Sequence, residues 1–289
     1  MIPVLGLRYV RLGTRDLARA TDFATRILGL QEIGRLGAAE GSRSVFFRSD
    51  NRHHTLVYFE GEPATQAIGL EIGDAAALRA EARRLASQGG AIHLGGRDDC
   101  AIRNVAALAV TRDPSGNVIE LVTPARDTDG VYVPPRMAGI AGLSHVGLRS
   151  LNPARDEAFW TSVFGARVSD RIGTAPMMRF DDQHHQIALL PAKRPGIQRV
   201  AFRVESINEV MKAWYFLREN GVRIVFGPGR EPTSTAIFLY FEGPDGMLFE
   251  FYTGAKTIAA DSQRARQYPL AARSFCMWGG KPDMADFNL

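Results

Sequence analysis

Short runs of alternating apolar and polar residues dominate the chain, and turn-forming residues separate them. The run at 236–243, AIFLYFEG, predicts a β-strand, because its apolar side chains would cover both faces of an extended segment. Segments 16–29 and 152–165 have a helical pattern and end in glycine, which suits the left-handed residue after a helix. The pattern therefore predicts a protein that mixes helices with many short strands.

The second half of the chain repeats the first. The stretch GLRYVRL at 6–12 matches GLSHVGL at 142–148, and a helical segment follows each. Positions that differ between the halves are the better functional candidates, because positions that agree can serve the shared fold. The repeat pairs Tyr9 with His145, His53–His54 with His184–His185, Ala67 with Arg199, and Glu120 with Glu250.

Each half reads as strand, helix, several short strands, a second helix and final strands. This order predicts an α+β fold of two tandem modules, in each of which a pair of βαβββ units forms an open, barrel-like sheet with helices outside. The predicted divisions are an N-terminal structural module at 1–125, a Pro- and Gly-rich linker at 126–140, a C-terminal module with the active-site cavity at 141–256, and a tail at 257–289.

Composition and charge exclude several classes of protein. The 35 basic and 31 acidic residues are scattered, so we expect no basic face for nucleic acid. No apolar run reaches the roughly 18 residues of a membrane helix, and the first residues lack the pattern of an export signal. Two distant cysteines, Cys100 and Cys276, indicate no disulfide framework and favour a reducing cytoplasm. We therefore expect a cytoplasmic protein with no nucleic-acid or membrane partner.

The doubled βαβββ pattern resembles the vicinal oxygen chelate superfamily, which includes glyoxalases and bleomycin-resistance proteins. Together with this pattern, the turn RSDNRHH at 48–54 and the ending MWGGKPD at 277–283 resemble type I extradiol ring-cleavage dioxygenases. The resemblance covers nearly the whole chain. It implies a small aromatic substrate and a homo-oligomer, either a dimer or a larger assembly.

The resemblance also implies the site residues. In that family two histidines and one glutamate bind Fe(II), and the matching motifs would make His145 and Glu250 two of these ligands. His185 would be the acid–base residue, and Tyr240 would contact a substrate hydroxyl. The second histidine ligand falls at Arg199.

A further histidine of the family, expected after the sequence GPGR, is replaced by Glu231. For Arg230 and Glu231 the simpler interpretation is a solvated loop. The predicted catalytic residues are His145, His185 and Tyr240, and the predicted substrate-binding residues are His184, Arg199 and Glu250.

Arginine cannot serve as the missing metal ligand, because guanidinium stays cationic and has no lone pair to donate. Near Glu250, Arg199 would instead form a charge-assisted pair, with an attraction of about 4 kcal/mol at about 4 Å and an effective dielectric of about 20. The sequence therefore favours no cofactor and no metal. Fe(II) is the alternative, and His145 and Glu250 would then bind it.

These observations predict an extradiol-dioxygenase-like protein that acts on a hydroxylated, catechol-like small molecule with an incomplete Fe(II) site. An enzyme is favoured over a binding protein. One alternative is a metal-independent enzyme, such as a cofactor-free oxygenase, lyase, hydrolase or isomerase, that uses Arg199 and the histidines. The other is a non-catalytic protein that binds an aromatic ligand.

Overall fold

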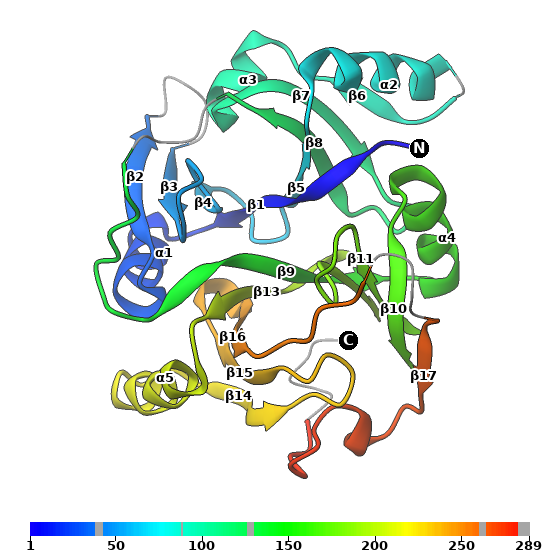
Figure 1. Ribbon diagram of the computed structural model, residues 1–289. Helices are drawn as coiled ribbons and strands as arrows, with labels where there is room; N and C mark the ends of the chain where they lie inside the picture. Colours follow the sequence, from blue (N-terminus) through cyan, green and yellow to red (C-terminus); the bar gives the residue numbers. More distant parts are fainter. Residues whose placement is uncertain (38–42, 88, 126–129, 260–263, 283–289) are drawn as a thin grey trace.

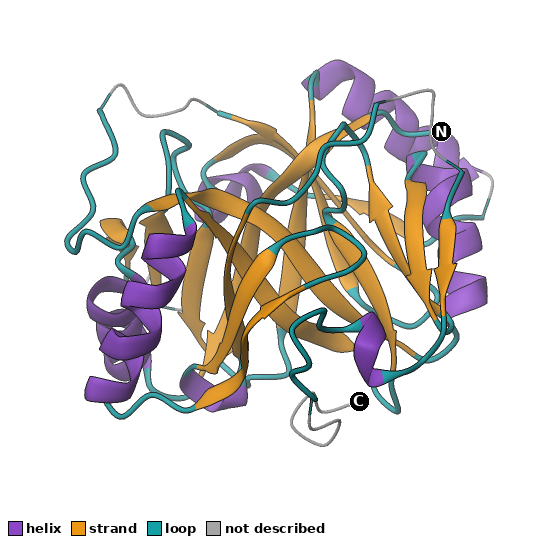
Figure 2. Ribbon diagram, turned by 60° about the horizontal axis from the view of Figure 1, so that its bottom comes forward, coloured by secondary structure: helices purple, strands orange, loops and turns teal. Residues whose placement is uncertain are grey.

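The computed structural model describes residues 1–37, 43–87, 89–125, 130–259 and 264–282. Two curved sheets, one from each half of the chain, lie against each other (Figure 1). Helices gather on the outer sides of the strands (Figure 2). The predicted α+β fold of two tandem modules is therefore confirmed. Part of the predicted linker, residues 126–129, and the final residue of the MWGGKPD motif lie outside the described residues.

The sheet of the N-terminal half has the strand order β2-β3-β4-β1-β5-β8-β7-β6. Its strands are β1 (Val4–Thr14), β2 (Gln31–Leu36), β3 (Ser44–Arg48), β4 (Leu56–Glu60), β5 (Gln66–Ile72), β6 (Ile92–Leu94), β7 (Val105–Arg112) and β8 (Val118–Pro124). Its helices are α1 (Leu17–Asp22), the π-helix η1 (Phe23–Leu28), α2 (Ala75–Ser87) and α3 (Arg97–Arg103).

The sheet of the C-terminal half has the order β14-β15-β16-β13-β9-β12-β11-β10-β17. Its strands are β9 (Ile140–Ser150), β10 (Arg167–Ile172), β11 (Ala175–Arg179), β12 (Ile187–Pro191), β13 (Gly196–Val204), β14 (Ile224–Arg230), β15 (Ile237–Glu242), β16 (Leu248–Thr253) and β17 (Arg266–Tyr268). Its helices are α4 (Pro153–Phe164), α5 (Ile207–Glu219) and the short 3-10 helices η3 (Pro244–Gly246) and η4 (Ala272–Ser274).

The repeat seen in the sequence is also a repeat of strand pairing. Strand β9 pairs in parallel with β12 and antiparallel with β13, as β1 pairs with β4 and β5. The helical segments end as predicted, because Gly29 and Gly165 have φ angles of 83° and 68°. The first of these segments differs in one respect, since α1 continues as the π-helix η1 rather than as one regular helix. None of the described helices combines the length and apolar character needed to cross a membrane.

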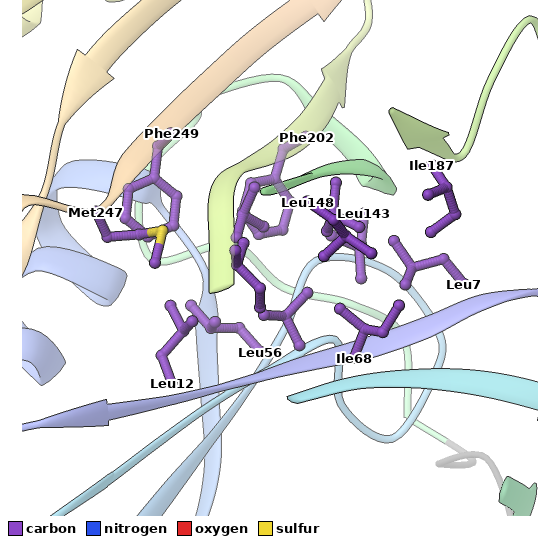
Figure 3. Close-up of a cluster of buried hydrophobic side chains, with 14 of the residues drawn as sticks. Leu7, Leu12, Leu56, Ile68, Leu143, Leu148, Ile187, Phe202, Met247 and Phe249 are labelled. Atoms are coloured by element: carbon purple, nitrogen blue, oxygen red, sulfur yellow. The ribbon is translucent and has the colours of Figure 1, made fainter. Parts of the chain in front are cut away.

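One apolar core joins the two halves of the chain (Figure 3). Leu12 and Leu56 of the N-terminal sheet lie opposite Phe249 of β16 and Met247, which immediately precedes β16. A buried polar contact also joins the two halves, because the Ser115 hydroxyl donates a hydrogen bond to the Asp156 carboxylate of α4. The two sheets are therefore packed as one body.

Strand β15 shows how this packing leaves room for a site. On one face, Leu239 and Phe241 belong to the core that joins the two halves. On the other face, Phe238 and Tyr240 belong to a second apolar cluster inside the C-terminal sheet. The alternation of the strand thus directs one set of side chains to the core and the other to the interior of the barrel.

Candidate active site

Three buried side chains meet on adjacent strands inside the C-terminal barrel. His145 lies on β9, Arg199 on β13 and Glu250 on β16, and each residue is at most 5% exposed. His145 Nε2 and Arg199 Nε each lie 3.0 Å from the same carboxylate oxygen, Oε2 of Glu250. The strand register explains the meeting, because Ala201 of β13 pairs with both His145 and Glu250. All three are residues for which the sequence analysis predicts a role in the site.

Arg199 stands beside another buried polar residue because β13 contains a bulge. The register of β13 against β9 shifts between Ile197 and Arg199, and Gln198 falls in the shift. Gln198 is fully buried and accepts a hydrogen bond from Arg199 Nη1 at 3.2 Å. Gly147 makes room for this pair, since a Cβ atom there would lie 2.8 Å from Arg199 Nη1 and 2.9 Å from Gln198 Oε1.

Tyr240 closes one side of the network. It pairs with Glu250 across β15 and β16, and the Arg199 guanidinium carbon lies 5.5 Å from its ring centroid. Burial raises the pKa of the Tyr240 hydroxyl well above its usual value, which the positive charge of Arg199 only partly offsets. The hydroxyl therefore stays protonated, and it hydrogen bonds to Glu250 and Glu231.

Glu231 lies inside the site rather than in a solvated loop. Its side chain accepts a hydrogen bond from Ser234 and is 9% exposed. Burial, reinforced by the charge of Glu250, raises the pKa of Glu231 to about 7. The prediction for this residue was wrong because a hydrogen-bonded turn at 231–235 folds the loop inward. Arg230, by contrast, is exposed as predicted.

Two neighbouring histidines form a chain of hydrogen bonds behind His145. The Nδ1 atoms of His184 and His185 are 2.9 Å apart, and His184 Nε2 lies 2.8 Å from Asp170 Oδ2. The rings of His185 and His145 have centroids 4.2 Å apart. Burial lowers the pKa of His184, and it lowers the pKa of His185 well below the usual value. Within the described residues, the buried His185 Nε2 has no hydrogen-bond partner.

The charges at the centre of the network are tightly balanced. Burial alone would raise the pKa of Glu250, but His145 and Arg199 hold it below the usual value. Burial lowers the pKa of His145, so its imidazole is neutral near pH 7. Burial would also lower the pKa of Arg199, yet Tyr240 and Glu250 raise it above the usual value. One guanidinium therefore compensates the Glu250 carboxylate.

Two cavities border this network. A polar cavity of about 400 Å³ is lined by His145, His184, His185, Glu231, Tyr252 and Lys256 among others. A smaller cavity of about 200 Å³ has mostly apolar walls. Three residues of the hydrogen-bond network around Glu250 also line it: Arg199, Tyr240 and Glu231. The walls of this apolar cavity include Ile172, Met177, Ala188, Phe226, Leu270 and Phe275. Glu231 lines both cavities, so it lies between them.

The structure brings the predicted residues together and adds others. His145, Arg199, Tyr240 and Glu250 are in one network, and His185 lies next to it with His184 behind. Sequence reasoning missed Asp170, which anchors His184, because nothing marks this carboxylate along the chain. One signal in the repeat was not recognised: Gly147 stands where the first half has Arg11. The hydrogen bonds from Arg266 of β17 to Asp170 were also missed, and no feature of the sequence indicates them.

Known proteins with similar sequences are dioxygenases. The chain is 25% identical over 297 residues to the iron-dependent extradiol dioxygenase of Rhodococcus jostii (strain RHA1), covering 96% of each chain. It is 28% identical over 293 residues to the biphenyl-2,3-diol 1,2-dioxygenase of Pseudomonas sp. (strain KKS102), covering 95% of this chain and 96% of the relative. These relatives support a dioxygenase-like function.

The fold is shared with a metal-bound protein of known structure. The Mn(II)-bound glyoxalase from Novosphingobium aromaticivorans matches with a TM-score of 0.84 at 21% identity, over 99% of this chain and 94% of that chain. The prediction that no cofactor is favoured is therefore wrong: one relative is iron-dependent and this structural neighbour binds Mn(II). The prediction relied on one side chain, Arg199, and gave too little weight to the rest of the resemblance.

The donor set of this chain nevertheless differs from a site with three protein ligands. His145 and Glu250 are in contact and could both face one ion, but the third neighbour of the Glu250 carboxylate is the Arg199 guanidinium. In the part of the chain that the structure describes, no three His, Cys, Asp or Glu side chains are grouped to hold a metal ion. The residues present therefore do not fit a three-ligand metal site.

A match to a family model covers both halves of the chain. The sequence model of one superfamily matches residues 6–121 and again residues 142–251, which are the two repeats described above. Both the duplicated sheet and the duplicated sequence are thus accounted for. The chain belongs to the Glyoxalase/Bleomycin resistance protein/Dioxygenase superfamily.

Proposed function

We propose that the protein binds a hydroxylated aromatic small molecule in the C-terminal module and acts on it as a dioxygenase-like enzyme. The observation that carries this proposal is the mostly apolar cavity whose lining includes Arg199, Tyr240 and Glu231. Its walls, which include Met177 and Phe226, suit an aromatic ring. The polar groups in its lining suit a ring hydroxyl, since a phenolic oxygen both donates and accepts hydrogen bonds.

Arg199 is the group best placed to bind a substrate oxygen. Its Nε atom donates to Glu250 and its Nη1 atom to Gln198, which fixes the plane of the guanidinium. A fixed, buried cation stabilises a phenolate oxygen more strongly than a solvated one does, because water does not screen it. Arg199 would thus lower the cost of removing a proton from a bound phenol.

His185 lines the neighbouring cavity, which shares Glu231 with the apolar one, and we propose it as the base for a ring hydroxyl that reaches that cavity. The Asp170 carboxylate can only accept, so His184 Nε2 carries a proton and donates to it. In neutral His184 the Nδ1 atom is then an acceptor, and His185 Nδ1 must donate to it. The remaining lone pair of neutral His185 is on Nε2, the unpartnered atom. This assignment makes His185 a base with its acceptor atom ready for a substrate proton.

We propose that the iron site of the relatives is incomplete in this chain. His145 and Glu250 would supply two protein ligands, and Arg199 would occupy the place of a third. A divalent ion would contribute Lewis acidity and a binding place for oxygen ligands. The location in the cytoplasm and the assembly into homo-oligomers stay predictions, as do the catalytic roles of the named residues.

Oxygen uptake tests this proposal. The protein is purified without air, incubated with Fe(II) or Mn(II), and mixed with catechol or biphenyl-2,3-diol in an oxygen electrode. We expect uptake with a diol, and we expect His185→Gln to lower kcat about 100- to 10,000-fold, the usual contribution of a general base. His54→Gln is the matched control, because His54 has the same Nδ1 contact and an unpartnered Nε2 in the N-terminal half.

Two results would contradict the proposal. The first is the absence of oxygen uptake with every diol tested while the metal content, measured in the same sample, is high. The second is an equal effect of His185→Gln and His54→Gln, because the position in the N-terminal half lies outside the proposed site. Far-UV circular dichroism of both variants shows whether each remains folded.

A further inference from the structure

The N-terminal half contains a cavity of its own at the place that corresponds to the candidate active site. This cavity has a volume of about 360 Å³ and contains Ala67 and Glu120, the repeat partners of Arg199 and Glu250. Its charged lining residues in the described part of the chain are Arg11, Arg103, Arg112 and Glu120. Three guanidinium groups against one carboxylate leave an excess of positive charge.

The one lining carboxylate is already occupied by other donors. Glu120 Oε2 accepts from the Tyr9 hydroxyl at 2.6 Å, and Glu120 Oε1 accepts from Arg103 Nε at 2.7 Å. Arg11 Nε is 4.0 Å from Oε1, too far for a hydrogen bond. Glu120 therefore neutralises mainly Arg103, and its ion pair with Arg11 is longer and has no hydrogen bond.

Arg11 is the unusual member of this group. It is 8% exposed, and its Nη1 atom is buried with no hydrogen-bond partner within the described residues. Its guanidinium carbon lies 5.2 Å from the centroid of the Phe59 ring. A buried donor without a partner costs free energy, and such groups normally have an acceptor. Burial also lowers the pKa of Arg11, as expected for a cation that lacks full compensation.

The remaining walls are suited to a small organic molecule. Phe59, Ile102, Val110 and Val118 line the cavity together with Ala67. Ala67 lines the cavity at the position that Arg199 holds in the C-terminal half, and its methyl side chain is much smaller than that of arginine. An acceptor that enters this space with an apolar body attached would contact both Arg11 and these walls.

We propose that the N-terminal module binds a small organic carboxylate in this cavity. Arg11 binds the carboxylate group, Arg103 and Arg112 add to the positive potential, and the apolar walls contact the body of the ligand. A guanidinium binds a carboxylate with two parallel hydrogen bonds, which fits the free Nη1 atom of Arg11. This site is separate from the proposed catalytic site, because none of its lining residues belongs to the C-terminal sheet.

Calorimetric titration with benzoate tests the proposal, with benzamide as the neutral analogue and inorganic phosphate as an anion without an apolar body. Arg11→Gln removes the proposed anchor, and Arg199→Gln is the matched variant that removes the buried guanidinium of the other half. We expect benzoate to bind the wild-type protein, and we expect Arg199→Gln to lose only the part of this binding that the C-terminal cavity contributes. We expect Arg11→Gln to weaken binding about 10- to 100-fold, as for loss of a charge-assisted contact. Benzamide and phosphate should bind more weakly than benzoate.

The proposal is overturned if benzoate binding survives Arg11→Gln unchanged, if Arg199→Gln rather than Arg11→Gln abolishes it, or if benzamide or phosphate binds as tightly as benzoate. Ala67→Leu provides a second variant in case Arg11→Gln does not fold. It fills the cavity but keeps every charge, so loss of benzoate binding supports the site and unchanged binding overturns it. Oxygen uptake is not part of the measurement, so failure of the proposed enzymatic function would leave this result intact.

Discussion

Arg199 faces Gly147 across β13 and β9, and this cross-strand pair is reversed in the N-terminal half, where Arg11 faces Ala67 across β1 and β5. Each half therefore sends one guanidinium into its barrel, but from opposite strands of the same strand pair. The two cations differ in their partners. Arg199 donates to Glu250 at 3.0 Å, whereas Arg11 lies 4.0 Å from Glu120.

A methyl group at position 147 should displace the side chains of Arg199 and Gln198 and so destabilise the folded protein. In Gly147→Ala, the new Cβ atom would lie under 3.0 Å from polar atoms of Arg199 and Gln198, so both side chains must shift. We expect a loss of about 1–3 kcal/mol in the free energy of unfolding, the usual cost of overpacking. Urea denaturation measures it. Gly34→Ala is the matched control, because a Cβ atom there meets nothing within 4 Å.

A double mutant separates this contact from a general effect of alanine in a strand. If the clash with Arg199 is the cause, adding Gly147→Ala to Arg199→Ala should cost much less than adding it to the wild-type protein. Equal costs in the two backgrounds would show that the space at Gly147 serves something other than Arg199.

Replacing Arg199 with histidine should increase metal affinity. The variant Arg199→His removes a cation from beside the Glu250 carboxylate and supplies a neutral imidazole as a third possible ligand. We expect it to bind Fe(II) or Mn(II) about tenfold or more tightly than the wild-type protein, as measured by competition with a chelator. Arg199→Gln is the control, since it removes the charge without adding an imidazole. A wild-type affinity that equals that of Arg199→His would contradict an incomplete site.

Much of the site was predictable because the chain contains an internal comparison. Matching the two halves marked His145 and Arg199 as positions that differ, on strands facing one cavity, and the family resemblance added Glu250. The same comparison could not reveal the bulge at Gln198, because a register shift depends on how two strands pack and leaves no periodic signal. It also could not predict that Glu231 is buried, since burial there depends on a turn and on neighbouring strands.

The error about the cofactor has a different physical origin. A single side chain decides whether a histidine ligand is present at one position, but it does not decide whether the remaining donors can take part in binding a metal ion. His145 and Glu250 remain in contact with each other, and the relative from Rhodococcus jostii is iron-dependent. The presence of Arg199 therefore does not by itself show that the protein binds no metal.

The contact between the tail and the barrel should make stability depend on pH in the acid range. Asp170 is fully buried and is paired with His184, with Arg266 of β17 and, at 3.8 Å, with Lys256. Burial would raise its pKa, but the hydrogen bonds from His184 and Arg266 lower the pKa of Asp170 to about 2. The folded protein therefore holds this proton less tightly than the unfolded chain does.

The sign of the effect follows from proton linkage. Because the pKa of Asp170 is lower in the folded state, its stabilisation is fully present above about pH 4 and is lost as the pH falls toward 2. We expect the wild-type protein to lose about 2 kcal/mol of unfolding free energy over this range that Asp170→Asn does not lose. Urea denaturation at several pH values measures the difference, and Asp182→Asn, at an exposed position, controls for the change in net charge. Parallel pH profiles of the wild-type protein and Asp170→Asn would contradict the pairing of Asp170 with His184 and Arg266, because a carboxylate with an unperturbed pKa contributes no such slope.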